Sequence, residues 1–143
     1  MECGARLPHS KELLPEIRIG RGFKRETAMQ LNGHPQHIDW ANIPVKQLEE
    51  GIERQMIVGE KMMICRLRFA PHIVTPAHDH PHEQMTIVER GRVLFTIGNE
   101  QRLAQAGEVL CFPSGTWHGA TMLEDEVVLV DIFSPIREDF LAL

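Results

Sequence analysis

The chain from Gly51 onward consists of short β-like runs of largely apolar residues, separated by turn residues. Such runs recur roughly every eight to twelve residues, a spacing typical of an all-β sandwich or barrel. Strands are predicted at residues 53–58, 61–69, 84–89, 93–97, 102–106, 109–112, 118–122 and 127–133. No helix of ordinary length is expected, but residues 137–141 fit one helical turn that would fold Phe140 back onto the strands.

The N-terminal part of the chain has a different texture. Residues 1–38 contain many glycines, prolines, histidines and charges and no sustained period, so we expect a mobile N-terminal extension. Residues 39–50 lead into the strands, with Trp40 and Ile43 as docking residues. A chain of 143 residues suits one domain with a real core, and a single domain is predicted at 39–143.

Composition and charge narrow the classes of function. The chain is 43% hydrophobic and 24% charged, as is typical of a soluble globular protein. Its formal charge of -5 argues against a nucleic-acid partner, since phosphate binding needs a basic face. No run approaches the roughly 18 apolar residues of a membrane helix, and the N-terminus lacks the apolar core of a secretory signal. We therefore expect a cytoplasmic protein without a membrane partner.

The three cysteines, Cys3, Cys65 and Cys111, are too far apart for a disulfide framework or a zinc knuckle. Cys65 and Cys111 lie inside apolar runs, where a small buried hydrophobic residue is the usual role. Both are predicted to be core residues.

The histidine-rich stretch Pro76–Gly91 carries the strongest candidate chemistry, and reads Pro-Ala-His-Asp-His-Pro-His-Glu-Gln-Met-Thr-Ile-Val-Glu-Arg-Gly. Neutral imidazole nitrogens bind metals, and side chains two positions apart on an extended chain share a face. His78 and His80 are therefore predicted neighbours, and Gln84 joins them if the extension continues. Alternation also admits His82. Standing alone, the stretch would be interpreted as a solvated loop.

A second stretch, residues 107–118, changes that interpretation. It reads Gly-Glu-Val-Leu-Cys-Phe-Pro-Ser-Gly-Thr-Trp-His. Pro113 and Gly115 make a turn that neither a central strand nor a helix would tolerate, and the turn delivers His118 at the start of the next strand. A single histidine there would usually be structural, but paired with the first stretch it is a candidate metal ligand.

Together the two stretches resemble the cupin superfamily, whose motifs have the forms Gly-x5-His-x-His-x3,4-Glu-x6-Gly and Gly-x5-Pro-x-Gly-x2-His-x3-Asn. The spacing is kept here over residues 78–91 and 107–118. Three positions depart: His72 replaces the first glycine, Gln84 the glutamate and Met122 the last asparagine. The resemblance implies an all-β fold, a small double-stranded β-helix or jelly-roll barrel.

The resemblance also implies one divalent metal ion per chain. The ligands that it carries over are His78, His80, Gln84 and His118. Three imidazoles and a neutral amide leave the charge of the ion uncancelled, so the site should attract anions and act as a Lewis acid. The sequence does not select among nickel, iron, manganese and zinc.

The C-terminal strand adds Asp131 and Phe133, which share a face with Leu129. A carboxylate among apolar neighbours has a raised pKa and suits acid/base work. Arg137 could make a bidentate contact with a substrate carboxylate. Alternatively, Asp131 and Arg137 pair with each other at the mouth of the barrel.

Asp-x-Phe-x3-Arg near the C-terminus, with His-Pro-His-Glu-Gln in the first motif, is similar to the KdgF-type pectin-degradation cupins. Those proteins convert 4,5-unsaturated uronates, the products of pectin and alginate lyases, into linear keto forms. The resemblance implies a small anionic, sugar-like substrate, with Asp131 shuttling the proton, Arg137 holding the uronate carboxylate and Phe133 shaping the pocket.

Two other functions remain open. One is an iron or manganese dioxygenase, because three histidines with open coordination positions also bind oxygen. The other is a non-catalytic module that binds a small acid or a sugar. In each case a homodimer is expected, because apolar strand surface at residues 56–58 and 62–64 is left to be covered.

Overall fold

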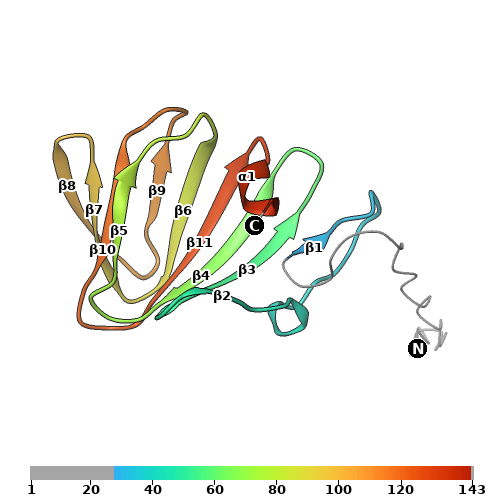
Figure 1. Ribbon diagram of the computed structural model, residues 1–143, viewed down its shortest axis with the longest axis horizontal. Helices are drawn as coiled ribbons and strands as arrows, with labels where there is room; N and C mark the ends of the chain where they lie inside the picture. Colours follow the sequence, from blue (N-terminus) through green and yellow to red (C-terminus); the bar gives the residue numbers. More distant parts are fainter. Residues whose placement is uncertain (1–27, 143) are drawn as a thin grey trace, which may run out of the picture.

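A computed structural model describes residues 28–142, drawn as a ribbon in Figure 1. The described residues form eleven strands, a short 3-10 helix η1 (Trp40–Asn42) and one helical turn α1 (Glu138–Leu141). The strands are β1 Met29–Gln30, β2 Lys46–Glu49, β3 Ile52–Val58, β4 Met63–Phe69, β5 Val74–His78, β6 Glu83–Arg90, β7 Arg92–Ile97, β8 Glu100–Gln105, β9 Val109–Phe112, β10 His118–Met122 and β11 Val127–Ser134. Neither helix in this part of the chain is long and apolar enough to cross a membrane.

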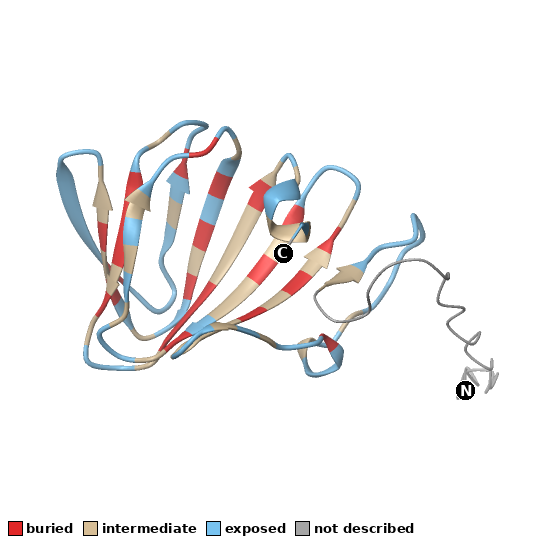
Figure 2. Ribbon diagram, in the orientation of Figure 1, coloured by how far each residue is buried: buried red, intermediate tan, exposed pale blue. Residues whose placement is uncertain are grey.

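The eight predicted strands are all present, as β3, β4 and β6 to β11, with ends within two residues of those predicted. Burial alternates along β3 and β6, as Figure 2 shows, because successive side chains point to opposite faces. The predicted helical turn is α1. Its Phe140 lies edge-on to Phe133, with 5.7 Å between the ring centroids.

Two hydrogen-bonded sheets make up the fold. The larger sheet has the strand order β1-β3-β4-β11-β6-β9, with β2 also pairing with β3, and the smaller has the order β5-β10-β7-β8. All pairs are antiparallel except β1 with β3. This double-sheet arrangement confirms the predicted jelly roll.

The core divides into two clusters. The larger one joins both sheets and contains Phe69, Val88, Val93, Phe95, Ala104, Phe112, Ala120, Met122, Val127 and Leu129. The smaller one lies on the inner face of β3, β4 and β11 and contains Met56, Val58, Met63, Cys65 and Phe133. Ile136, Phe140 and Leu141 pack against this smaller cluster, so α1 covers the part of the large sheet that the small sheet leaves open (Figure 1).

Two predictions about exposed and buried residues were wrong. Met56, Val58 and Met63 were expected on an uncovered surface but are at most 2% exposed, because alternation turns them inward. Cys111 was expected in the core but is exposed, since it alternates with the inward-facing Phe112. Cys65 is buried as predicted.

The segment that precedes β3 is attached to the outer side of the sheet. The side-chain amide of Gln55 donates to the carbonyl oxygens of Trp40, at 2.7 Å, and Ile43, at 2.9 Å. Ile43 is 3% exposed, in keeping with its predicted docking role. Of the predicted extension, residues 28–38 are described, and β1 within them pairs with the end of β3. Residues 1–27 lie outside the described part of the chain.

Two backbone positions account for the glycine pattern of the first motif. Gly91 joins β6 to β7 with a φ of 80°, and a Cβ there would lie 2.5 Å from the carbonyl oxygen of Glu126, so only glycine fits. His72 stands where the motif has its first glycine, and its φ of 65° lies in the same left-handed region. The histidine thus keeps the turn before β5 that the motif's glycine would form, but its backbone is strained because it carries a side chain.

Candidate metal centre

Four polar side chains converge between the sheets, and they are His78, His80, Gln84 and His118. The small sheet supplies the last residue of β5 and the first of β10, the large sheet supplies Gln84 near the start of β6, and His80 lies in the connection. His78 and His118 are register partners on neighbouring strands. A Cβ on Gly119 would lie 2.9 Å from the backbone of Ala77, so this glycine lets β10 approach β5 closely.

One ring nitrogen of each histidine faces the others. The three ligand atoms lie within 4.8 Å of one another. Each Nδ1 is bound to a backbone carbonyl: that of Pro76 at 3.0 Å from His78, of His82 at 3.1 Å from His80 and of Thr116 at 2.7 Å from His118. A carbonyl oxygen only accepts, so Nδ1 carries the proton in each ring and Nε2 keeps its lone pair. These backbone contacts orient the rings for a metal.

Aromatic packing fixes two of the rings further. His118 stacks on Phe112 with 4.5 Å between centroids, and His80 meets Phe133 edge-on at 5.7 Å. Burial lowers the pKa of His80 to about 4 and also lowers the pKa of His118. Both imidazoles are therefore neutral at pH 7, which is the form that binds metals.

A chain of hydrogen bonds orients the Gln84 amide. The hydroxyl of Thr86 donates to Oδ1 of Asp131 at 2.6 Å and accepts from Nε2 of Gln84 at 2.9 Å. Because the amide nitrogen faces Thr86, Oε1 faces the histidines, 3.0 Å from Nε2 of His80 and 3.2 Å from Nε2 of His118.

The resulting donor set fits a cation. Three imidazole lone pairs and one amide oxygen point at one another, and all of them are acceptors when the tautomers are those that the backbone carbonyls require. A divalent metal ion resolves the repulsion among them, and nitrogen with neutral oxygen suits several transition metals. The residues present thus fit the divalent metal that the sequence implies.

The carboxyl group of Asp131 is partly buried at the other end of this chain of hydrogen bonds. Burial raises its pKa to about 6, and the hydrogen bond from Thr86 opposes that rise only in part. This agrees with the expectation from Leu129 and Phe133 on the same face. A carboxyl group with such a pKa can both take up and release a proton near neutral pH.

Arg137 is 8% exposed and does not pair with Asp131. Its Nε and Nη2 instead donate to the two carboxylate oxygens of Asp139, at 2.9 and 2.7 Å. The guanidinium lies 4.1 Å from the ring centroid of Phe140 and 5.3 Å from that of Phe133. Arg137 is thus held rigidly, with Nη1 outside the ion pair.

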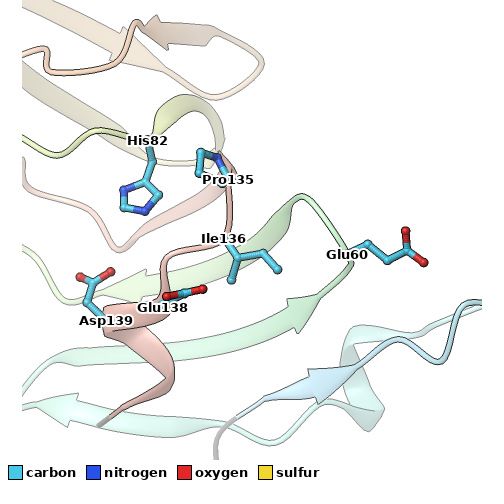
Figure 3. Close-up of a pocket in the computed structure, with 6 residues that line it drawn as sticks. All are labelled: Glu60, His82, Pro135, Ile136, Glu138 and Asp139. Atoms are coloured by element: carbon cyan, nitrogen blue, oxygen red, sulfur yellow. The ribbon is translucent and has the colours of Figure 1, made fainter.

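A cleft of about 490 Å³ opens beside the centre, lined by Glu60, His82, Pro135, Ile136, Glu138 and Asp139. Figure 3 shows His82 and Asp139 pointing toward each other across it. Alternation had admitted His82 beside Gln84 as a candidate ligand. Strand β5 ends at His78 and β6 begins at Glu83, so the chain between them is not extended and alternation does not apply there. His82 faces this cleft, whereas Gln84 joins the three histidines.

Comparison with known proteins identifies the family. Residues 65–133 match the family described as Cupin domain. The pectin degradation protein KdgF of Dickeya dadantii (strain 3937) is 35% identical over 101 residues, which are 68% of this chain and 91% of that protein. The chain belongs to the cupin family. Its resemblance to KdgF-type cupins is likewise confirmed.

Two solved cupin structures agree with this assignment. KdgF from Halomonas sp. is 30% identical with a TM-score of 0.64, over 68% of this cupin and 92% of that chain. An RmlC-like cupin from Shewanella frigidimarina NCIMB 400 is 26% identical with a TM-score of 0.68, over 74% of this cupin and 96% of that chain.

Sequence reasoning missed two residues of this cupin's candidate site. Thr86 follows Gln84 by two positions on a strand, so alternation places both side chains on one face and could have identified it. Asp139 follows Arg137 by two positions at the start of a helical turn. A local partner for the arginine was therefore available without the distant Asp131.

Proposed function

We propose that the protein is a metal-dependent enzyme that opens 4,5-unsaturated uronates to their linear keto forms by proton transfer. Such uronates are products of pectin and alginate lyases. The supporting observation is the hydrogen-bond chain from Asp131 through Thr86 to Gln84, which joins a partly buried acid/base group to a proposed metal ligand. The similarity to KdgF supports the substrate class.

The reaction is an isomerisation that moves one proton and breaks one bond. The C1 hydroxyl loses its proton and the C1–O5 bond breaks, leaving an aldehyde at C1. The electron pair passes to the enol system, C4 takes up a proton and C5 becomes a ketone. Substrate and product contain the same atoms, so no oxidant or co-substrate is required.

Each residue of the site has a proposed role in this reaction. Asp131, with a pKa of about 6, is the proposed proton carrier. Arg137 is proposed to bind the uronate carboxylate, and Phe133, in contact with both His80 and Arg137, shapes the space between them. A bound divalent ion would supply a Lewis acid that polarises sugar oxygens.

The charge of the ligand set favours an anionic substrate. Gln84, His78, His80 and His118 add no negative charge, so a divalent ion would keep its full charge at the centre. Arg137 adds a second cation nearby. A monoanionic sugar acid is therefore attracted to this centre despite the acidic surface.

The proposal is tested with protein loaded in turn with nickel, iron, manganese or zinc. Loss of the ring double bond is followed in the ultraviolet on pectin- and alginate-derived unsaturated monomers, with and without protein, because these sugars also open spontaneously. A faster loss is expected with at least one metal. An unchanged rate with every metal would contradict the proposal, and substrate-dependent oxygen uptake by the iron form would favour a dioxygenase.

A homodimer is part of the same proposal. The outer face of the large sheet carries a row of apolar residues in register across six strands, formed by Met29, Ile57, Ile64, Ile132, Met85 and Cys111. The large sheet's outer face is not covered by the small sheet. A second copy packed on this row would remove it from water.

A further inference from the structure

Arg54 is a buried guanidinium that the site described so far does not use. It lies on β3 with only 3% of its surface exposed. Its neighbours on the same face are Met56 and Val58, so its side chain enters the interior between α1 and the large sheet. Burial lowers the pKa of Arg54 below its ordinary value. The guanidinium still keeps its charge, because arginine holds its proton more firmly than any other side chain in proteins.

Two of the hydrogen-bond donors of Arg54 have no acceptor. Nε and Nη2 are both buried and both without a partner among residues 28–142. These two atoms form the edge of a guanidinium that binds a carboxylate with two parallel hydrogen bonds. Buried donors without partners are rare in native proteins. The Nε–Nη2 edge of Arg54 is thus a bidentate pair of buried donors with no acceptor among residues 28–142.

Arg137, which is proposed to bind the uronate carboxylate, differs from Arg54 because its donors on this edge have a partner. The same edge of Arg137, Nε and Nη2, is already engaged by Asp139. Both guanidiniums contact the ring of Phe140, at 4.5 Å for Arg54 and 4.1 Å for Arg137. The two cations therefore lie on one aromatic side chain, with the carboxylate of Asp139 paired to only one of them.

Arg54 also borders the interior region that contains Asp131. Cys65 on β4 is the register partner of Asp131 on β11 and of Met56 on β3, and Met56 shares the inward face of β3 with Arg54. Asp131, Cys65 and Arg54 thus lie on the same face of the large sheet.

We propose that Arg54 is a second anion-binding residue of this site, whose Nε–Nη2 edge receives the carboxylate of a sugar acid while Arg137 stabilises the same charge. The inference rests on the proposed uronate substrate for the class of ligand. It assigns the bidentate contact to Arg54, because the corresponding edge of Arg137 is occupied.

The test is binding of D-galacturonate and D-galactose to the metal-loaded protein by isothermal titration calorimetry. The two sugars differ in the carboxylate, so the comparison isolates its contribution. Arg54→Met should weaken galacturonate binding by about tenfold or more, as expected for a lost charge-assisted pair, and leave galactose binding within about twofold. Arg68→Met is the matched control, since Arg68 pairs with Glu53 and is exposed, and it should leave both sugars unaffected.

Arg54→Lys keeps the charge but not the two-pronged edge, and should also weaken galacturonate selectively. If Arg54→Met does not fold, binding of the two sugars is measured with Arg54→Lys instead. Equal affinities of wild type and variants for galacturonate, or equal weakening for both sugars, would overturn the proposal and leave Arg54 a structural residue bound to internal water.

The outcomes are separable from those of the ring-opening assay. Selective, Arg54-dependent binding of galacturonate without ring-opening activity would contradict the proposed function alone. Ring opening by wild-type protein with an unchanged KM in Arg54→Met would contradict the role of Arg54 alone.

Discussion

The hydroxyl of Thr86 donates a 2.6 Å hydrogen bond to Oδ1 of Asp131, and this bond decides which way the neighbouring Gln84 amide faces. Once the hydroxyl proton is given to the carboxylate, its oxygen accepts from the amide nitrogen, and the amide oxygen turns to the histidines. The proposed proton carrier and the proposed metal ligand are therefore coupled through one side chain that is fully buried.

Replacing Thr86 with valine should weaken metal binding. The substitution keeps the shape of the side chain but frees the Gln84 amide to rotate, and losing such an orienting contact typically costs about 10–100-fold in metal affinity. Competition with a chromophoric chelator measures the change. Thr121→Val, on β10 and outside the hydrogen-bond chain, is the control. Affinity equal to wild type in Thr86→Val would contradict the coupling.

His80→Ala should lose most of the bound metal. Three ligands from two distant segments would then remain, and they close the site poorly. Elemental analysis of the purified variant gives the metal content per chain. His82→Ala is the matched control, because His82 lies two residues away and faces the cleft, and it should keep its metal. Full occupancy in His80→Ala would refute the ligand set.

Asp131→Asn should change how stability depends on pH. The pKa of Asp131 is about 6 in the folded protein against an ordinary value of 3.8. Between these values the folded state holds the proton more tightly, so the contribution of this carboxyl is complete at low pH and is lost as pH rises through about 6. Asparagine resembles the protonated form at every pH.

The stability of Asp131→Asn relative to wild type should therefore rise between about pH 4 and pH 7, by on the order of 2–3 kcal/mol. Urea unfolding of the metal-free proteins at several pH values measures it. Metal-free samples are needed because a bound cation would stabilise the ionised carboxylate. A difference that stays constant across this range is the outcome that would count against a raised pKa.

Ile64→Lys should convert the expected homodimer to a monomer. Ile64 lies in the middle of the outward-facing apolar row, and a charge there would have to be desolvated in the interface. Light scattering at micromolar protein gives the mass. Leu103→Lys, on the exposed strand β8 of the other sheet, should remain dimeric. A monomeric wild-type protein would refute the dimer itself.

Much of the fold could be predicted because eight strands are β-like runs that turn residues separate. Of the three strands that were not predicted, β5 contains Pro76, which argues against a central strand. In the fold β5 is at the edge of its sheet, where a missing amide donor is tolerated. The short strands β1 and β2 were not predicted, because two and four residues are too few to display a period.

The sequence predicted the residues of the centre but not the reason for their meeting. His78 and Gln84 were expected to share a face of one extended segment. They come instead from different sheets, because the chain turns between β5 and β6. The family motif groups the same four residues that lie together in the structure, since its spacing already contains that turn.

Arg54 could have been noticed from its position. Ile52, Met56 and Val58 share one face of the strand by alternation, and Arg54 falls on the same face. What alternation cannot supply is its lack of a partner, because pairing depends on which distant side chains arrive. The same holds for Arg137, whose partner is the nearby Asp139 rather than Asp131.

Steady-state kinetics of Asp131→Asn on an unsaturated uronate test the central claim most directly. If Asp131 carries the proton, kcat should fall by about 100-fold or more toward the spontaneous rate, with metal content unchanged. Arg137→Ala, measured alongside, should chiefly raise KM because it removes a binding contact. A kcat for Asp131→Asn within about threefold of wild type, with full metal occupancy, would contradict the account.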